Sequence, residues 1–265
     1  PKAKLYEHEA ISRANHVEAT ETAFGKGARQ NRRLDKAEKI LSLDSDFLGL
    51  EPLGSMTNGD FSARRNPEEG DMNRLYVVEN GFSLTGGMAD HRLPVRTSEI
   101  AYIAAAFAKA ISKVTGNSLP GDIAGLVKGS IDETAQEWIT RCAEDLAASK
   151  GKSIVVCGAR QPLAVQALTI AINAALDAFG ATIDVLSGTP APAADTLGQL
   201  AEDARDGKIS TLFVLDGDPA LTAPVDLDWA TRQEEIPNVV SLANRVDNTA
   251  AAADWVLPKA HYLES

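Results

Sequence analysis

The chain contains the stretch A-D-H-R-L-P at 89–94 and nearly repeats it as A-D-W-V-L-P at 253–258. Each copy lies downstream of an apolar run that ends in Asp-x-Asp. These runs are K-I-L-S-L-D-S-D at 39–46 and T-L-F-V-L-D-G-D at 211–218. Short continuous apolar runs are typical of parallel strands that are covered on both faces. The repeated order of strand, acidic turn and Ala-Asp step therefore predicts two similar α/β units.

The rest of the chain extends this alternation of strand and helix. The pattern predicts strands at 37–43, 75–79, 153–157, 182–186, 211–215, 239–242 and 255–257, and helices at 100–114, 132–149, 162–179 and 196–206. A weak helical pattern covers 5–17, and Gly and Pro make 47–71 a predicted loop. The expected fold class is α/β with two doubly wound, Rossmann-like parallel-sheet units. Their expected bounds are 1–116 and 132–265, joined by a linker at 117–131.

The composition excludes several classes of protein. A net charge of -11 and a pI near 4.9 argue against a nucleic-acid binder, which normally carries a basic stripe. No apolar stretch is long enough to span a bilayer. Cys142 and Cys157 are not part of a C-x-x-C pair, so the sequence carries no zinc or iron–sulfur signature and both are expected to be small buried hydrophobes. The basic group at 29–33 is expected to be a solvated face rather than a phosphate site.

The Asp-x-Asp steps are the first candidate sites. Ligands of open parallel sheets bind beyond the carboxyl ends of the strands, where Asp44 with Asp46 and Asp216 with Asp218 lie. Such carboxylates can hold Mg²⁺ or bond a ribose or guanine. The competing and favoured interpretation is that they turn the chain and cap backbone N–H groups, since Gly217 accompanies the second pair.

A second candidate is the loop at 158–161, between a buried strand and a predicted helix. Free N–H groups at a helix N-terminus can bind a phosphate, and Arg160 either assists or caps the surface. The loop lacks the G-x-G-x-x-G pattern, so it is a weak dinucleotide signal. His91 and His261 lie near the two repeated stretches, and a hydrogen-bonded structural role is favoured over proton transfer for both.

The order of these motifs resembles the middle of the molybdopterin oxidoreductases, which hold molybdenum through two pterin guanine dinucleotides. The resemblance covers nearly the whole chain. It is carried, in order, by L-S-L-D-S-D-F-L-G, by R-L-Y-V-V-E-N-G-F-S-L-T-G-G-M-A-D-H-R-L-P-V with V-R-T-S-E-I, and by I-V-V-C-G-A-R-Q, L-F-V-L-D-G-D-P and N-T-A-A-A-A-D-W-V-L-P-K-A-H-Y-L-E-S. If the cofactor is retained, the resemblance implies that it is bound by Glu79, Arg96, Thr97, Gly158, Arg160, Gln161, Asp216, Gly217 and Asp218.

Within that family the chain is most similar to the fused molybdopterin-like and iron–sulfur subunit of alternative complex III, a quinol-oxidising respiratory assembly. The stretches M-N-R-L-Y-V-V-E, G-M-A-D-H-R-L-P-V and A-H-Y-L-E-S carry this similarity. The resemblance implies a molybdopterin-like part without its cofactor, and iron–sulfur clusters only in regions outside these residues. It also implies cytochrome c and quinol-binding membrane subunits as partners, on the periplasmic side of the membrane.

Two departures from active relatives support a lost cofactor. Arg96 to Glu99 stand where relatives have Pro-Gly-Thr-Asp, which removes a turn that admits a dinucleotide. Asp218 precedes Pro219 where relatives have Asn, and a carboxylate repels phosphate. The sequence therefore predicts a cofactor-free scaffold domain of an electron-transfer subunit, with no catalytic or metal-binding residue and a tendency to self-associate through an exposed edge or apolar patch. An active molybdenum oxidoreductase and an unrelated nucleotide-binding α/β protein are the alternatives.

Overall fold

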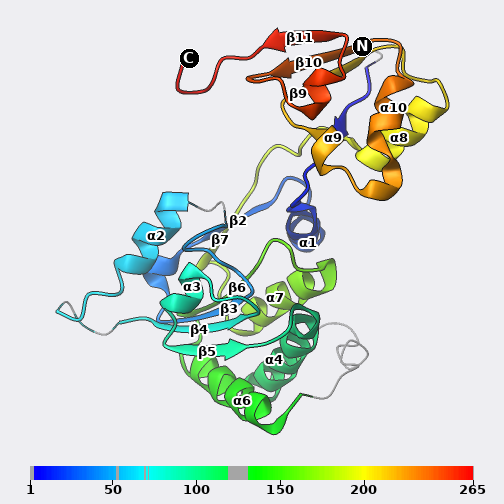
Figure 1. The fold of residues 1–265 in the computed structure, drawn as a ribbon. Helices are drawn as coiled ribbons and strands as arrows, with labels where there is room; N and C mark the ends of the chain where they lie inside the picture. Colours follow the sequence, from blue (N-terminus) through cyan, green and yellow to red (C-terminus); the bar gives the residue numbers. More distant parts are fainter. Residues whose placement is uncertain (1–2, 52–53, 69, 71, 119–130, 265) are drawn as a thin grey trace. The chain divides into compact units, whose positions relative to one another are not determined.

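The protein is described by a computed structural model that covers residues 3–51, 54–68, 70, 72–118 and 131–264. The chain forms two compact units (Figure 1). One is continuous and contains residues 13–191, and the other combines residues up to 12 with those from 192 onward. The second unit is therefore built from both ends of the sequence.

A four-stranded parallel sheet forms the centre of the 13–191 unit. Its strands lie in the order β5 (His91–Pro94), β4 (Arg74–Glu79), β3 (Lys39–Leu43) and β6 (Ser153–Cys157). The chain builds outward from β3 to β5 and then returns to place β6 on the other side of β3. The reversal between β3 and β6 is a topological switch point, where open α/β sheets hold their ligands.

The two faces of this sheet bury alternate residues of the strands. Leu41, Val78 and Val155 point toward α4 (Ile100–Thr115), α6 (Glu133–Ala148) and α7 (Leu163–Ala175). Ile40, Val77 and Ile154 point to the other face, against residues that include Phe47 and Phe61. Phe61 belongs to α2 (Gly54–Ser62). Helix α1 (Ala14–Phe24) packs on α7, and β2 (Arg29–Arg32) pairs antiparallel with β7 (Ile183–Leu186). The short elements are η1 (Leu34–Lys36), α3 (Leu84–Gly87) and η2 (Thr97–Glu99).

A smaller parallel sheet organises the other unit. Its order is β11 (Trp255–Pro258), β10 (Val239–Ala243) and β9 (Leu212–Leu215). The core residues Leu197, Leu200, Trp229, Ile236 and Val239 join it to α8 (Leu197–Arg205) and α10 (Trp229–Glu234). The unit also contains α9 (Pro219–Thr222), η3 (Val225–Leu227) and α11 (Asn248–Ala251), and β1 (Tyr6–Glu7) pairs with β8 (Asp195–Thr196).

The two Ala-Asp stretches lead into equivalent strands. Asp90 exchanges two hydrogen bonds with Leu75, from its backbone N–H at 2.9 Å and to its carboxylate at 2.8 Å. Asp254 makes the same two bonds with Val239, at 3.0 and 2.7 Å. In each unit the aspartate thus joins the start of an edge strand, β5 or β11, to the neighbouring strand. The fold confirms the predicted α/β class with parallel sheets.

Several predicted elements differ from the structure. The segment 5–17 is not a helix throughout, since β1 lies at its start and α1 begins at Ala14; the predicted loop at 47–71 contains α2. The strand at 183–186 forms, but as the antiparallel partner of β2. The predicted boundary at 117–131 separates β3 from β6, whereas the structure pairs these strands in one sheet and divides the chain after 12 and after 191. Residues 119–130 of the predicted linker lie outside the described part.

Candidate functional site

The switch point between β3 and β6 is tightly closed. Asp44, which follows β3, has a left-handed backbone with φ 54°. A Cβ on Gly158, which follows β6, would overlap the backbone carbonyl oxygen of Asp44. Glycine at 158 is therefore required by the approach of two chain segments of this protein.

The Asp44 carboxylate faces inward and is satisfied by the β6–α7 loop. It is buried, and it accepts a hydrogen bond from Gln161 Nε2 at 2.7 Å, while Arg160 Nη2 lies 3.6 Å away. Burial raises the pKa of Asp44 above its ordinary value, although the bond from Gln161 and the charge of Arg160 oppose the shift. The side chains of Gln161 and Arg160, both predicted ligand residues, therefore contact a carboxylate of the chain itself.

Three N–H groups of the turn that precedes α7 have partners. Gly158 N donates to Leu43 O at 2.9 Å, and Gln161 N donates to Gly158 O at 3.1 Å. Ala159 N donates to Glu51 Oε1 at 3.1 Å, and Pro162 has no N–H. A phosphate bound to Ala159 N would have to displace the Glu51 carboxylate, which the protein itself supplies. Glu51 therefore disfavours the pyrophosphate of a dinucleotide at Ala159.

The remaining predicted residues of this unit also bond to neighbours. Glu79 is buried at the end of β4 and accepts from Arg92 Nε at 2.6 Å and Ser83 Oγ at 2.5 Å. Arg96 N donates to Glu99 Oε2 at 2.8 Å, and Thr97 Oγ1 accepts from Asn80 Nδ2 at 2.6 Å. These contacts hold the loops that follow β4 and β5.

The predicted residues Asp216, Gly217 and Asp218 lie together in the other unit. They line a pocket of about 630 Å³ at the carboxyl ends of β9 and β10, with Asn244, Arg245, Asp247, Lys259, His261 and Glu264. Lys259 forms an ion pair with Asp216. Four carboxylates therefore face two cationic side chains and one histidine, which is a poor environment for a phosphate.

The second aspartate of each Asp-x-Asp step caps a helix start. Asp46 Oδ1 accepts from Thr85 N at 3.0 Å and Thr85 Oγ1 at 2.9 Å. Asp218 Oδ1 accepts from Thr249 N at 2.9 Å and Thr249 Oγ1 at 2.6 Å. Partial burial opposes the shift, but the hydrogen bonds lower the pKa of both carboxyls. These bonds agree with the favoured turn and cap role.

Sequence reasoning missed the two threonines that complete this arrangement. Each threonine hydroxyl also accepts a backbone N–H at 3.0 Å, Leu48 in the first unit and Ala220 in the second. The signal was present as T-x-x-x-A-D, since Thr85 precedes Asp90 by five residues and Thr249 precedes Asp254 by five. The repeated sequence pattern thus encodes a hydrogen-bonded aspartate–threonine motif that joins the loops at the ends of neighbouring strands.

Other polar candidates have structural surroundings. His91 stacks on Tyr76 with ring centroids 4.8 Å apart, and His261 lies against Tyr262. Both cysteines are buried, and burial raises the pKa of Cys157 to about 12. Arg32 departs from the expected solvated face, because its Nη1 is buried and lacks a hydrogen-bond partner among the described residues. Among those residues, no cluster of His, Cys, Asp or Glu could hold a metal ion, and no helix could cross a membrane.

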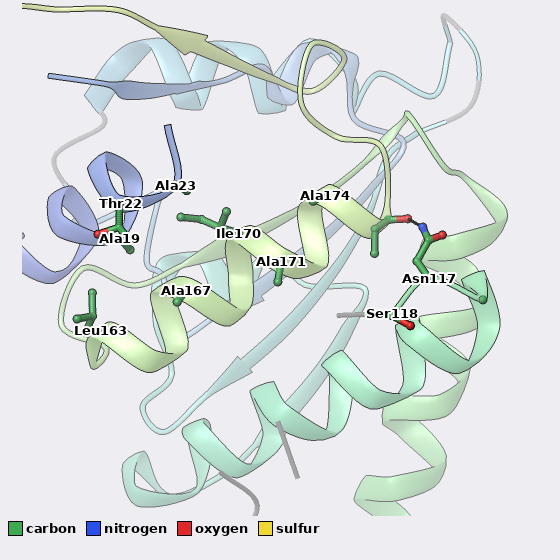
Figure 2. Close-up of a pocket in the computed structure, with 12 residues that line it drawn as sticks. Ala19, Thr22, Ala23, Asn117, Ser118, Leu163, Ala167, Ile170, Ala171 and Ala174 are labelled. Carbon is green, nitrogen blue, oxygen red and sulfur yellow. Dashed lines mark hydrogen bonds between the residues drawn. The ribbon is translucent and has the colours of Figure 1, made fainter. Parts of the chain in front are cut away.

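A second hollow, of about 690 Å³, lies between α1 and α7 (Figure 2). Half of its twelve lining residues are alanine, and Leu163 and Ile170 add larger apolar side chains. At one end Asn117 Nδ2 donates to Ala175 O at 3.2 Å. No charged side chain and none of the predicted cofactor residues line it.

Comparison with known proteins identifies the fold but not a family. No protein-family model and no curated protein matches the chain. The fold resembles that of acetylene hydratase. For the enzyme from Pelobacter acetylenicus the TM-score is 0.69 at 14% identity, over 97% of this chain and 45% of that one. The formyltransferase/hydrolase complex from Methylorubrum extorquens, solved with methylofuran, gives a TM-score of 0.52 at 12% identity, over 97% and 72%.

The chain thus spans less than half of the acetylene hydratase chain. This likeness agrees with the predicted α/β fold with parallel sheets. At such low identity it establishes the fold alone.

Proposed function

We propose that this chain is a molybdopterin oxidoreductase-like domain that packs against other parts of a respiratory quinol-oxidising complex. We also propose that it does not bind the pterin guanine dinucleotide. The observation that carries the proposal is the turn before α7. There Ala159 N–H is held by Glu51, and Gln161 is held by the buried Asp44. Anion-binding turns need free N–H groups, and these two carboxylates would also repel a phosphate.

The partners in this proposal follow from the resemblance to the alternative complex III subunit. They are cytochrome c and quinol-binding membrane subunits, on the periplasmic side of the membrane. Iron–sulfur clusters belong to regions other than these residues. In this role the domain contributes surface and shape, and electrons pass through other parts of the assembly.

Calorimetric titration with guanosine diphosphate tests the cofactor-free state. We expect no binding at millimolar ligand to the unchanged chain. Glu51→Ala should create weak binding, because it frees Ala159 N–H and removes a negative charge. Glu68 is an exposed carboxylate outside the turn, so Glu68→Ala is the matched control and should not bind guanosine diphosphate.

Molybdenum analysis of the whole natural protein provides the second test. A content of one molybdenum per chain, or micromolar binding of the diphosphate to the unchanged chain, would refute the proposal and favour an active molybdenum oxidoreductase. The proposal is supported if the natural protein contains no molybdenum, the unchanged chain does not bind the diphosphate, and Glu51→Ala does bind it. The turn is then blocked by the carboxylates of the chain itself.

A nucleotide-binding protein of another kind is the second candidate. The pocket beside Asp216 favours it, because about 630 Å³ is in the range of small-molecule sites and Asp216 can accept from a base edge. Ligands that bind only the folded state raise the melting temperature. A rise with a free nucleoside, lost in Asp216→Ala and kept in the exposed control Asp226→Ala, would favour this candidate over the packing role.

A further inference from the structure

The β9–β10–β11 sheet leaves one face exposed. Its alternating register places six apolar side chains on that face, in two rows across the three strands: Phe213, Val240 and Trp255, then Leu215, Leu242 and Leu257. Phe213, Leu215 and Trp255 are 62, 66 and 67% exposed, and Leu257 is 47% exposed. We call these six residues the open face.

The opposite face shows what such a sheet normally requires. Leu212, Val214 and Val239 point to it and pack with Ala204 of α8 and with Ile236, which follows α10. Parallel sheets occur almost only with both faces covered. The open face is contiguous and contains two aromatic residues, whereas exposed apolar residues on ordinary surfaces are scattered. It has the character of an interface without its partner.

The dimensions of the open face fit one helix. Three strands at ~4.8 Å spacing and four residues at ~3.3 Å rise cover roughly 14 by 13 Å. An α-helix of ~10 Å diameter spans that length in about two and a half turns. A stable dimer needs about 800 Å² from each partner, far more than this patch supplies. Geometry therefore favours a helix over a second copy of the chain.

Charge selects the chemistry of that helix. Residues 192–265 contain thirteen Asp and Glu but five Lys and Arg, a net charge of -8. Asp216 follows Leu215 but is paired with Lys259, and Asp254 precedes Trp255 but accepts from Val239 N, so the attraction comes from the net charge of the unit. A partner with lysine and arginine beside its apolar stripe is attracted to this surface. An anionic membrane surface is repelled by it.

We propose that the open face docks a basic amphipathic helix of a partner protein. This inference rests on the packing role proposed above and adds the face and the partner chemistry. The apolar stripe of the helix covers Phe213, Leu215 and Trp255, and its basic flanks lie toward the acidic surface of the unit.

The test uses a 14-residue peptide of leucine and lysine, with leucine at helical spacing, and the intact chain. Binding should shift Trp255 emission to the blue, because an exposed indole becomes covered, while buried Trp229 stays unchanged. Phe213→Ser with Leu215→Ser should weaken binding at least tenfold. Val225→Ser with Leu221→Ser, at apolar positions 96 and 69% exposed elsewhere in the unit, should not weaken it.

Three results would overturn the proposal. One is equal loss of binding, or no loss, in the two paired variants. Another is equal binding of a peptide with glutamate in place of lysine, or binding of the chain to phosphatidylglycerol vesicles. The third is sedimentation as a dimer that Phe213→Ser dissociates. None of these measurements involves guanosine diphosphate or molybdenum, so this inference and the cofactor-free state fail separately.

Discussion

Asp44 and Asp46 lie two residues apart in the same turn, but their surroundings shift their pKa values in opposite directions. Asp44 is buried at the switch point, and desolvation raises its pKa. For Asp46, burial is outweighed by hydrogen bonds from Thr85 and Leu50, which lower its pKa. At neutral pH the charge on Asp44 therefore reduces the stability of the fold, and the charge on Asp46 increases it.

Replacing each carboxyl by an amide should separate the two effects. At pH 7, Asp44→Asn should raise the free energy of unfolding, and asparagine tolerates the left-handed backbone at this position. Asp46→Asn should lower it by about 1 kcal/mol, because one acceptor is lost. Denaturant titration, followed through Trp138 in the same unit, measures both.

The pH dependence carries the sign of each shift. The gain from Asp44→Asn should be complete above the folded pKa of Asp44 and absent below its ordinary value, where both states are protonated. The loss from Asp46→Asn should be complete above the ordinary carboxyl pKa and disappear as the pH falls through the lowered folded pKa. Effects of equal sign for the two variants at pH 7 would contradict this assignment.

Gly158 gives a steric prediction at the same site. A methyl group at 158 would overlap the Asp44 carbonyl oxygen, so Gly158→Ala should destabilise the 13–191 unit by about 1–3 kcal/mol. Gly59, inside α2 with nothing within 4 Å of its missing Cβ, is the matched control. Gly59→Ala should stabilise by about 0.5–1 kcal/mol. Thermal unfolding of both variants decides, and a neutral Gly158→Ala would show that the switch point can open.

Sequence reasoning identified this turn but could not settle its chemistry. Asp44, Gly158 and Gln161 were candidates because they follow predicted strands, and the structure brings them together. Their role depends on Glu51, which lies outside every predicted element and reaches Ala159 across 108 positions in the sequence. A contact of that separation has no local signature.

At the element scale, the two units share a hydrogen-bonded motif made of an aspartate at a strand end and a threonine. Each threonine hydroxyl donates to the aspartate and accepts a backbone N–H. Thr85→Val and Thr249→Val keep the side-chain shape and remove both bonds. Each should destabilise its own unit by about 1–3 kcal/mol, since a backbone N–H loses its acceptor.

The two threonine variants are compared by chemical denaturation, with Thr140→Val as control. Thr140 is exposed on α6 and bonds only within its own helix turn, so its change should stay within about 0.5 kcal/mol. Thr85→Val should act on the unit that contains Trp138, and Thr249→Val on the unit that contains Trp229. If only one of the two variants lowers the free energy of unfolding of its unit, the two stretches resemble each other in sequence but do not contribute equally to stability.

Elements with a strong periodic signal were predictable, and the others depended on distant partners. The run S-I-V-V-C coincides with β6, and Gly116 ends α4 with φ 73°. Helix α2 carries two glycines, and glycine disfavours helix, so its composition predicts loop. The direction of β7 was not readable from its residues, because β2 pairs with it across some 150 positions.

At the scale of the whole molecule, the N-terminal residues belong to the unit formed by the C-terminal third. Lys4 Nζ and Tyr6 Oη bond to Asp203 at 2.9 and 2.8 Å, and β1 pairs with β8. Hydrogen bonds from Lys4 and Tyr6 lower the pKa of Asp203 well below its usual range. A discontinuous unit cannot be inferred from local pattern, which is why the sequence placed 1–116 together.

Removing residues 1–12 tests this discontinuous unit, because it deletes β1 and two partners of Asp203, Lys4 and Tyr6. The 192–265 unit should lose stability while the 13–191 unit keeps it. With 5-fluorotryptophan, the fluorine resonance of Trp229 should report earlier unfolding by urea, and that of Trp138 an unchanged midpoint. Tyr6→Phe with Lys4→Met should reproduce part of the loss above the ordinary carboxyl pKa and none of it at acid pH, where Asp203 is protonated. An equal fall in both midpoints would mean that the two units unfold as one.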